Sequence, residues 1–243
     1  MDFLGYLAAA VVVWWIYSRI RSPGKPKVAA PPPPPRANVI IRSNLDQPKS
    51  RTQRTQRTKK PALIPAILPE EFIVFDLETT GLGAAHDSII EIGAIKANLS
   101  DLQNNKPAST FQTLVRSTDK VPENIVELTG ITTKMVVADG VSLEQAVKDF
   151  FAFAGNLPLV AYNAPFDLRF LDAAIKQCNL PERTNPAFCA LAVARQAWPG
   201  RQSYKLNDLA NSVDAGQAHR ALADCHRALI VFVTAMTATP KSH

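Results

Sequence analysis

Three short motifs, each with acidic residues at the edge of an apolar segment, constrain the fold of this 243-residue chain most strongly. They are FDLETTG at residues 75–81, YNAPFD at 162–167 and HRALAD at 219–224. Taken singly, each has an ordinary explanation: a solvated strand end, a helix N-terminal acid or a solvated helix face. All three in this order indicate a fold that gathers distant segments at one place. The residues to be gathered are Asp76, Glu78, Asp167, His219 and Asp224.

The first motif closes a buried strand that is predicted over residues 72–77. Because alternate residues of a strand share a face, Asp76 and Glu78 project together, while Leu77 projects to the opposite side. Short loops to two further strands favour an antiparallel meander. Those strands span residues 89–97 and 110–115.

The second motif joins a fourth predicted strand, residues 159–162, to a helix. Pro165 suits the first turn of that helix, which we expect to contain Asp167 and to run to about residue 178. Its apolar residues follow the spacing of an amphipathic helix. The expected buried stripe consists of Phe170, Leu171, Ala174, Ile175 and Cys178.

The remaining elements follow from local signals. Ser142-x-x-Gln145 is a capping-box pattern that opens a helix, and Gly155 ends it. His219 lies at the start of the last predicted helix, and Asp224 follows about a turn and a half later. A fifth strand and two closing helices are predicted at residues 187–189, 205–212 and 218–236.

Four carboxylates gathered in this way point to divalent cations. Two carboxylates about 4 Å apart repel by about 4 kcal/mol at an effective dielectric of 20, so a buried acidic cluster without a cation is costly. Two Mg²⁺ or Mn²⁺ ions prefer carboxylate oxygens, and such a pair supports phosphodiester cleavage. The motifs therefore predict a two-metal phosphodiesterase site with His219 beside it.

The net charge of +6 is unevenly distributed along the chain. Residues 19–60 carry 12 Lys/Arg and one acid, whereas residues 61–243 carry 15 Lys/Arg and 19 Asp/Glu. The proline run at 31–35 favours polyproline II, and RTQRTQRT at 51–58 has no apolar face to bury. We expect residues 22–66 to be a disordered basic linker. It would act as a solvated spacer or as a contact for anionic lipid or nucleic acid.

The N-terminus predicts a membrane anchor. Residues 3–17 form an unbroken apolar run, and the nearby positive charges, beginning with Arg19, all follow it. That asymmetry favours a single-pass helix over residues 1–21, with the following domain on the cytoplasmic side of the membrane. A cleaved signal peptide and a buried soluble helix are the alternatives, although Asp2 stands where a signal peptide has its positive charge. Three cysteines without C-x-x-C spacing fit a reducing compartment better than a disulfide framework.

The three motifs resemble those of the DEDDh exonuclease family, which includes the proofreading epsilon subunit of bacterial DNA polymerase III. LTGIT at residues 128–132 also resembles a segment of epsilon-like members, and the likeness runs from about Phe72 to Val233. It implies an α/β, ribonuclease H-like exonuclease domain over residues 67–240, with a five-stranded mixed sheet flanked by helices. It also implies 3′→5′ hydrolysis of nucleic acid to nucleoside 5′-monophosphates.

The resemblance also implies roles for single residues. Asp76, Glu78, Asp167 and Asp224 would hold the metals, with Asp76 bridging them, and His219 would be the general base. The implied contacts to substrate are Thr79, Thr80, Gly81, Leu82, Tyr162, Asn163 and Phe166. Tyr162 departs from the family pattern, because epsilon-like members often have histidine there, so we expect altered substrate handling.

Two other functions stay open on the sequence. One is a catalytically silent nucleic-acid-binding module of the same fold, although such a module has no reason to keep four repelling acids. The other is a secreted nuclease, if the N-terminal segment is cleaved. The expected partners are single-stranded or frayed 3′ ends of DNA or RNA, the membrane, and a polymerase on a separate chain.

Overall fold

The computed structural model describes residues 64–104, 106–210 and 219–238. These residues all belong to a single structural unit. The predicted anchor at residues 1–21 and the predicted linker up to residue 63 lie outside the described residues.

Five strands form one mixed sheet in the order β3-β2-β1-β4-β5. The pairs β1·β2 and β2·β3 are antiparallel, which confirms the predicted meander, and β1·β4 and β4·β5 are parallel. The five-stranded mixed sheet is therefore confirmed. The strands are β1 (Glu71–Thr79), β2 (Ile89–Asn98), β3 (Ser109–Leu114), β4 (Leu159–Ala161) and β5 (Ala187–Cys189).

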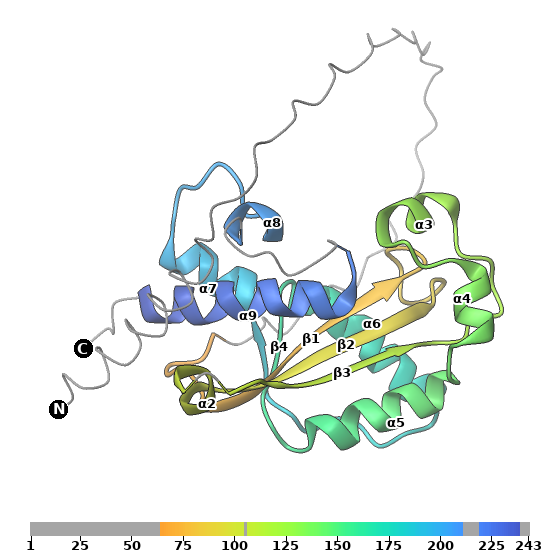
Figure 1. Ribbon diagram of the computed structural model, residues 1–243, viewed down its shortest axis with the longest axis horizontal. Coiled ribbons are helices and arrows are strands. Elements are labelled where there is room, and N and C mark those ends of the chain that lie inside the picture. Colours follow the sequence, from red (N-terminus) through yellow and green to blue (C-terminus); the bar gives the residue numbers. More distant parts are fainter. Residues whose placement is uncertain (1–63, 105, 211–218, 239–243) are drawn as a thin grey trace, which may run out of the picture. The chain divides into compact units, whose positions relative to one another are not determined.

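Helices cover both faces of this sheet (Figure 1). On one face, α5 (Leu143–Ala154) and α6 (Ala164–Gln177) pack against the sheet. On the other face lie α7 (Ala190–Ala197) and α9 (Ala221–Ala238), and α9 crosses β1 and β2. The central strands are consequently buried on both sides, which is why β1 is a nearly continuous apolar run.

Side chains of β1 alternate between these two cores. Phe75 and Leu77 belong to the core under α5 and α6. Phe72 and Val74 belong to the core under α9, where the Phe72 ring meets the Phe232 ring edge-on at a centroid distance of 5.3 Å. The face that α9 covers is therefore the face on which Asp76 also projects.

The predicted cap of α5 is confirmed. The Ser142 hydroxyl accepts a hydrogen bond from the Gln145 backbone N–H at 3.2 Å, and this satisfies one of the free donors at the start of the helix. The helix ends at Gly155, whose φ of 55° favours glycine over residues with a side chain.

Other boundaries differ from the sequence prediction. The last helix begins at Ala221 rather than at residue 218, because His219 has a left-handed φ of 59° that no α-helix accommodates. The predicted helix at 205–212 is the short α8 (Leu206–Leu209), and Cys178 is the half-buried C-cap of α6 rather than part of its buried stripe. Helices not predicted are α2 (Leu99–Gln103), α3 (Glu123–Thr129), α4 (Thr133–Ala138) and α7.

Among the described helices, α9 alone is long and apolar enough to cross a membrane by length and composition. Most of its residues are buried inside the domain, where they pack against β1, β2 and α7. In this domain α9 is therefore a core helix that packs, with α7, on one face of the sheet.

Candidate active site

β1 carries two of the motif acids at its carboxyl end. Strand alternation places Asp76 and Glu78 on the side of the sheet that α9 covers. Glu78 is 9% exposed, so its carboxylate is largely removed from bulk water. Regular pairing with β2 shifts register just after Glu78, where β1 turns into the Thr79-Thr80-Gly81 loop.

The first turn of α9 supplies a third acid. Asp224 is 8% exposed, and its Oδ2 accepts a hydrogen bond from the His219 backbone N–H at 3.3 Å. Its Oδ1 accepts a hydrogen bond from Arg227 Nη1 at 2.8 Å. The left-handed backbone of His219 thus turns its N–H toward the helix that carries Asp224.

These acids meet at one place. One carboxylate oxygen from each of Asp76, Glu78 and Asp224 lies within 4.8 Å of the other two. Asp167, in the first turn of α6, is 3% exposed and its Oδ1 accepts a hydrogen bond from the Leu77 backbone N–H at 3.3 Å. It therefore lies against β1, outside the three-oxygen group but beside the strand residues that carry two of its members.

The electrostatics of the cluster are those of crowded, desolvated carboxyls. Burial, and then repulsion from Asp167 and the other acids, raises the pKa of Asp76 well above its usual range. Burial, and then repulsion from Asp224, raises the pKa of Glu78 to about 8. Burial raises the pKa of Asp167 to about 7, although backbone hydrogen bonds oppose that rise. Near neutral pH the ionised forms of these carboxyls are therefore disfavoured unless a cation compensates their charge.

A divalent cation fits this donor set. Its ligands would be carboxylate oxygens, which hard cations such as Mg²⁺ and Mn²⁺ prefer. The residues that would hold it are Asp76, Glu78 and Asp224, with Asp167 adjacent. Among the described residues, this is the one group of three or more acids, histidines or cysteines close enough together to bind a metal ion.

The raised pKa values predict how the stability of the metal-free protein depends on pH. Folding raises the pKa of Glu78 from 4.5 to about 8 and that of Asp167 from 3.8 to about 7. The folded state then binds more protons than the unfolded state within this window, so stability falls as pH rises. We expect the melting temperature without divalent metal to decrease from about pH 5 to pH 8, and Mn²⁺ to restore more of it at the higher pH.

The matched control is Glu78→Gln, which removes one of the titrating groups while keeping its size. It should flatten the decline of the melting temperature with pH. A melting temperature that rises across the same window without metal would contradict the assigned pKa shifts.

The loop after β1 is organised by Asp87. The Thr80 hydroxyl donates to Asp87 Oδ1 at 3.4 Å, and the Gly83 backbone N–H donates to Asp87 Oδ2 at 2.8 Å. A Cβ at Gly81 would lie 2.5 Å from the same carboxylate, so a larger residue there would displace Asp87 from these hydrogen bonds. The Thr79 hydroxyl donates to the Gly81 carbonyl, and the next side chain, Leu82, is 80% exposed.

The residues of the second motif have different surroundings. The Tyr162 hydroxyl donates to the Tyr204 carbonyl, its ring packs against the α9-side core, and burial raises its pKa to about 12. Asn163 is the N-cap residue of α6 but makes no side-chain cap. Phe166 is half-buried, with its ring 5.1 Å from the Phe170 ring. The Tyr162 hydroxyl, like those of Thr79 and Thr80, is thus already engaged within the protein.

Two residues of β2 were not predicted and shape the site directly. Glu91 is wholly buried and binds Arg220 and Ala221 of the third motif. A Cβ at Gly93 would lie 2.6 Å from backbone atoms of Ala221 and Leu222, so the start of α9 rests directly on the strand. The sequence signal was a single acid inside the apolar segment IIEIGAIKA, followed two residues later by glycine.

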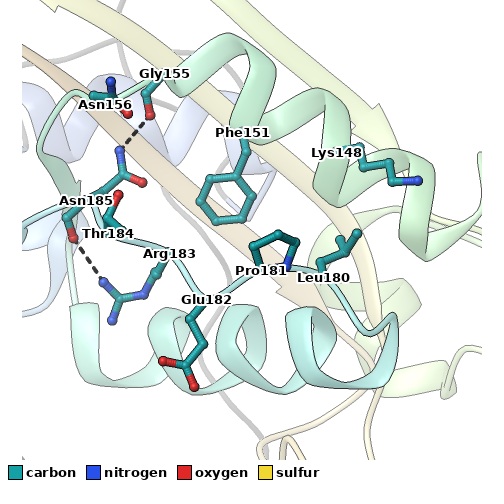
Figure 2. Close-up of a pocket in the computed structure, with 10 residues that line it drawn as sticks. All are labelled: Lys148, Phe151, Gly155, Asn156, Leu180, Pro181, Glu182, Arg183, Thr184 and Asn185. Carbon is teal, nitrogen blue, oxygen red and sulfur yellow. Dashed lines mark hydrogen bonds between the residues drawn. The ribbon is translucent and has the colours of Figure 1, made fainter.

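A separate hollow of about 360 Å³ lies between α5 and the segment that joins α6 to β5 (Figure 2). Asn185 there donates to the carbonyls of Gly155 and Leu157 at 2.8 and 2.7 Å, and Arg183 pairs with Asp172 at 2.8 Å. None of the residues that line it is a motif acid. Asn185 and Arg183 are engaged in holding this segment in place, and the described residues that line the hollow include no acid cluster, so the carboxylate cluster is the candidate for chemistry.

Comparison with known proteins agrees with this geometry. Residues 73–232 match the exonuclease family RNase_T, a span that contains all three motifs. The chain belongs to this exonuclease family. The "DNA polymerase III subunit epsilon" of Aquifex aeolicus is 30% identical over 169 residues, which cover 69% of this chain and 81% of that protein.

A second relative is much longer. The "DNA polymerase III PolC-type" of Halalkalibacterium halodurans is 36% identical over 160 residues, which cover 65% of this chain and 11% of that protein. The similarity to PolC-type chains is therefore confined to a small part of their length.

Solved structures share the fold. Exonuclease X in complex with 5′ overhanging duplex DNA superposes with a TM-score of 0.54 at 26% identity, covering 68% of this chain and 90% of that one. E. coli exonuclease I in complex with a dT13 oligonucleotide gives a TM-score of 0.55 at 18% identity, covering 66% and 40%. The ribonuclease H-like exonuclease fold expected from the sequence is thus confirmed.

Proposed function

We propose that this protein is a metal-dependent 3′→5′ exonuclease that acts on single-stranded or frayed ends of DNA and releases nucleoside 5′-monophosphates. The observation that carries the proposal is the cluster of Asp76, Glu78 and Asp224 in an exonuclease-family fold. DNA is favoured over RNA because similar proteins are named as DNA polymerase III chains or were solved with DNA.

In this proposal Asp76, Glu78, Asp167 and Asp224 hold two Mg²⁺ or Mn²⁺ ions. When bound, the ions supply activation of a water molecule and stabilisation of the charge that develops on the attacking and leaving oxygens. By holding the two ions in place, the carboxylates would orient the scissile phosphate. The positive charge of the ions would also relieve the repulsion among the carboxylates. His219 accepts the proton of the attacking water. The hydrogen bond from its backbone N–H to Asp224 holds the residue at the edge of the cluster.

The remaining motif residues bind the terminal nucleotide. Thr79, Thr80, Gly81 and Leu82 form the loop that leaves the site, and the exposed Leu82 side chain offers an apolar surface to a base. Asn163 and Phe166 lie at the start of α6, next to Asp167. Tyr162 would act indirectly, since its hydroxyl is engaged with Tyr204.

The direct test is incubation of a 5′-labelled single-stranded DNA oligonucleotide with the protein in Mg²⁺ and in excess chelator. We expect progressive shortening of the labelled strand with metal and an intact strand with chelator. An intact strand under both conditions would overturn the proposal.

We also propose that the domain is tethered to a membrane by residues 1–21, on the cytoplasmic side. The support is the apolar run at residues 3–17 with positive charge only after it. The full-length protein should sediment with membranes and resist carbonate extraction, whereas a chain that begins at Pro61 should be soluble and active. Recovery of unprocessed full-length protein in the soluble fraction would contradict the anchor.

A further inference from the structure

Glu91 is a completely buried acid whose two oxygens receive four hydrogen bonds. Oε1 accepts from Arg220 Nη2 at 2.6 Å and from Gln112 Nε2 at 3.0 Å. Oε2 accepts from Arg220 Nε at 3.2 Å and from the Ala221 backbone N–H at 3.0 Å. With its oxygens so engaged, and outside the three-oxygen cluster, Glu91 differs from the acids that would bind metal.

The partners of Glu91 are the residues that position the third motif. Arg220 directly follows His219, and Ala221 is the first residue of α9, the helix that carries Asp224 in its first turn. The bond to the Ala221 N–H satisfies one of the free donors at this helix start. Glu91 therefore fixes the two residues that follow His219, at the start of the turn that carries Asp224.

Close packing reinforces the same connection. Backbone atoms of Ala221 and Leu222 lie 2.6 Å from the position that a Cβ of Gly93 would take, and the Cys225 thiol donates to the Gly93 carbonyl at 3.3 Å. On the other side of the site, Glu91 is the β2 partner of Glu78 in the antiparallel register. Glu78 therefore lies on β1 directly beside the β2 residues that hold the start of α9.

Charge explains why the partner of Glu91 is an arginine. Like charges directly opposite each other on two strands destabilise a sheet, and Glu78 and Glu91 stand in that relation. The Arg220 guanidinium binds Glu91 through two nitrogens, a charge-assisted geometry that lysine does not reproduce. It neutralises the buried acid while leaving the oxygens of Glu78 to the cluster.

We propose that Glu91 and Arg220 form a positioning pair that sets where His219 and Asp224 stand relative to Asp76 and Glu78. The inference rests on the proposed exonuclease function, and in this role the pair acts by holding the third motif in place rather than by contacting substrate or metal. Loss of comparable supporting partners around a metal site costs about 10–100-fold in activity or metal affinity.

The experiment measures kcat and KM of the full chain on a single-stranded DNA oligonucleotide at saturating Mn²⁺. Glu91→Gln keeps the shape of the side chain but loses its charge, and Arg220→Lys keeps the positive charge but loses the two-nitrogen contact. We expect kcat to fall about 10–100-fold in Glu91→Gln, with KM little changed. Arg220→Lys should retain more turnover than Arg220→Gln.

Val231→Ala is the matched control for stability. Val231 lies on the same helix and is 1% exposed, so its truncation lowers the melting temperature without touching the third motif. At a temperature where all variants are folded, its kcat should equal that of the wild type. Wild-type kcat in Glu91→Gln, or a loss no larger than in a Val231→Ala protein of equal melting temperature, would overturn the positioning role.

Hydrogen exchange of residues 219–225 separates this inference from the proposed function. Exchange of these amides should be faster in Glu91→Gln than in the wild type, whether or not the protein hydrolyses DNA. If the wild type releases no nucleotide, the proposed function fails by itself. Equal exchange rates in the two proteins would then overturn the positioning pair.

Discussion

Replacing Asp76 with alanine is expected to abolish both hydrolysis and stabilisation by divalent metal. Asp76 belongs to the three-oxygen cluster, and the charges of Asp167, Glu78 and Asp224 all act on it. A catalytic metal ion supplies several kcal/mol of transition-state stabilisation, so turnover should fall by about 10³-fold or more. The measurement is an exonuclease assay beside melting curves with and without Mn²⁺.

Without metal, the same substitution should not lower the stability of the protein. Because Asp76→Ala removes one of several repelling carboxyls, the variant without metal should be at least as stable as the wild type. Asp172→Ala is the matched control, since Asp172 is an exposed acid that pairs with Arg183 outside the cluster. It should leave activity and the metal response unchanged. An Asp76→Ala protein that is still stabilised by Mn²⁺ as strongly as the wild type would exclude Asp76 as a ligand.

Replacing His219 is expected to stop turnover while leaving metal binding intact. The proposed role of His219 is that of general base, and loss of such a group costs about 10²–10⁴-fold in rate. The four acids are unchanged in this variant, so Mn²⁺ should raise its melting temperature as in the wild type. Turnover and melting curves on the same preparation therefore separate the two roles.

The backbone of His219 decides which substitution is the cleaner test. Its φ of 59° is tolerated by asparagine better than by alanine, so His219→Asn removes the base with less strain at the start of α9. His219→Ala and His219→Asn should lose turnover to a similar extent. Full activity in His219→Asn would remove the histidine from the mechanism and leave the metal site in place.

Local patterns in the sequence were sufficient for the central strands. Alternation along β1 predicted that Asp76 and Glu78 share a face, and Ser142 predicted the start of α5. These predictions succeeded because each depends on residues close together in the chain. The resemblance implied a mixed sheet of five strands, but the order of β4 and β5 at its parallel edge was not predicted, since nothing local specifies which strands pair.

The features that the sequence did not predict depend on residues far apart in the chain, or on an element boundary or backbone conformation that no local residue marks. Glu91 is bound by Arg220, which lies 129 residues further along the chain, so no local pattern reveals the pair. Helix α7 follows β5 directly at Ala190, with neither glycine nor proline between them to mark a new element. The start of α9 was placed too early because the sequence does not reveal that His219 adopts a left-handed backbone.

The measurement that tests the central claim most directly compares a linear, 5′-labelled single-stranded DNA with a circle of the same sequence. In Mg²⁺ or Mn²⁺ the linear strand should shorten stepwise from its 3′ end, with release of nucleoside 5′-monophosphates, and the circle should stay intact. Excess chelator should stop the release, and an RNA strand of the same sequence should be shortened more slowly. Cleavage of the circle, or no release of mononucleotide from the linear strand with metal present, would contradict the assignment of a metal-dependent 3′→5′ exonuclease.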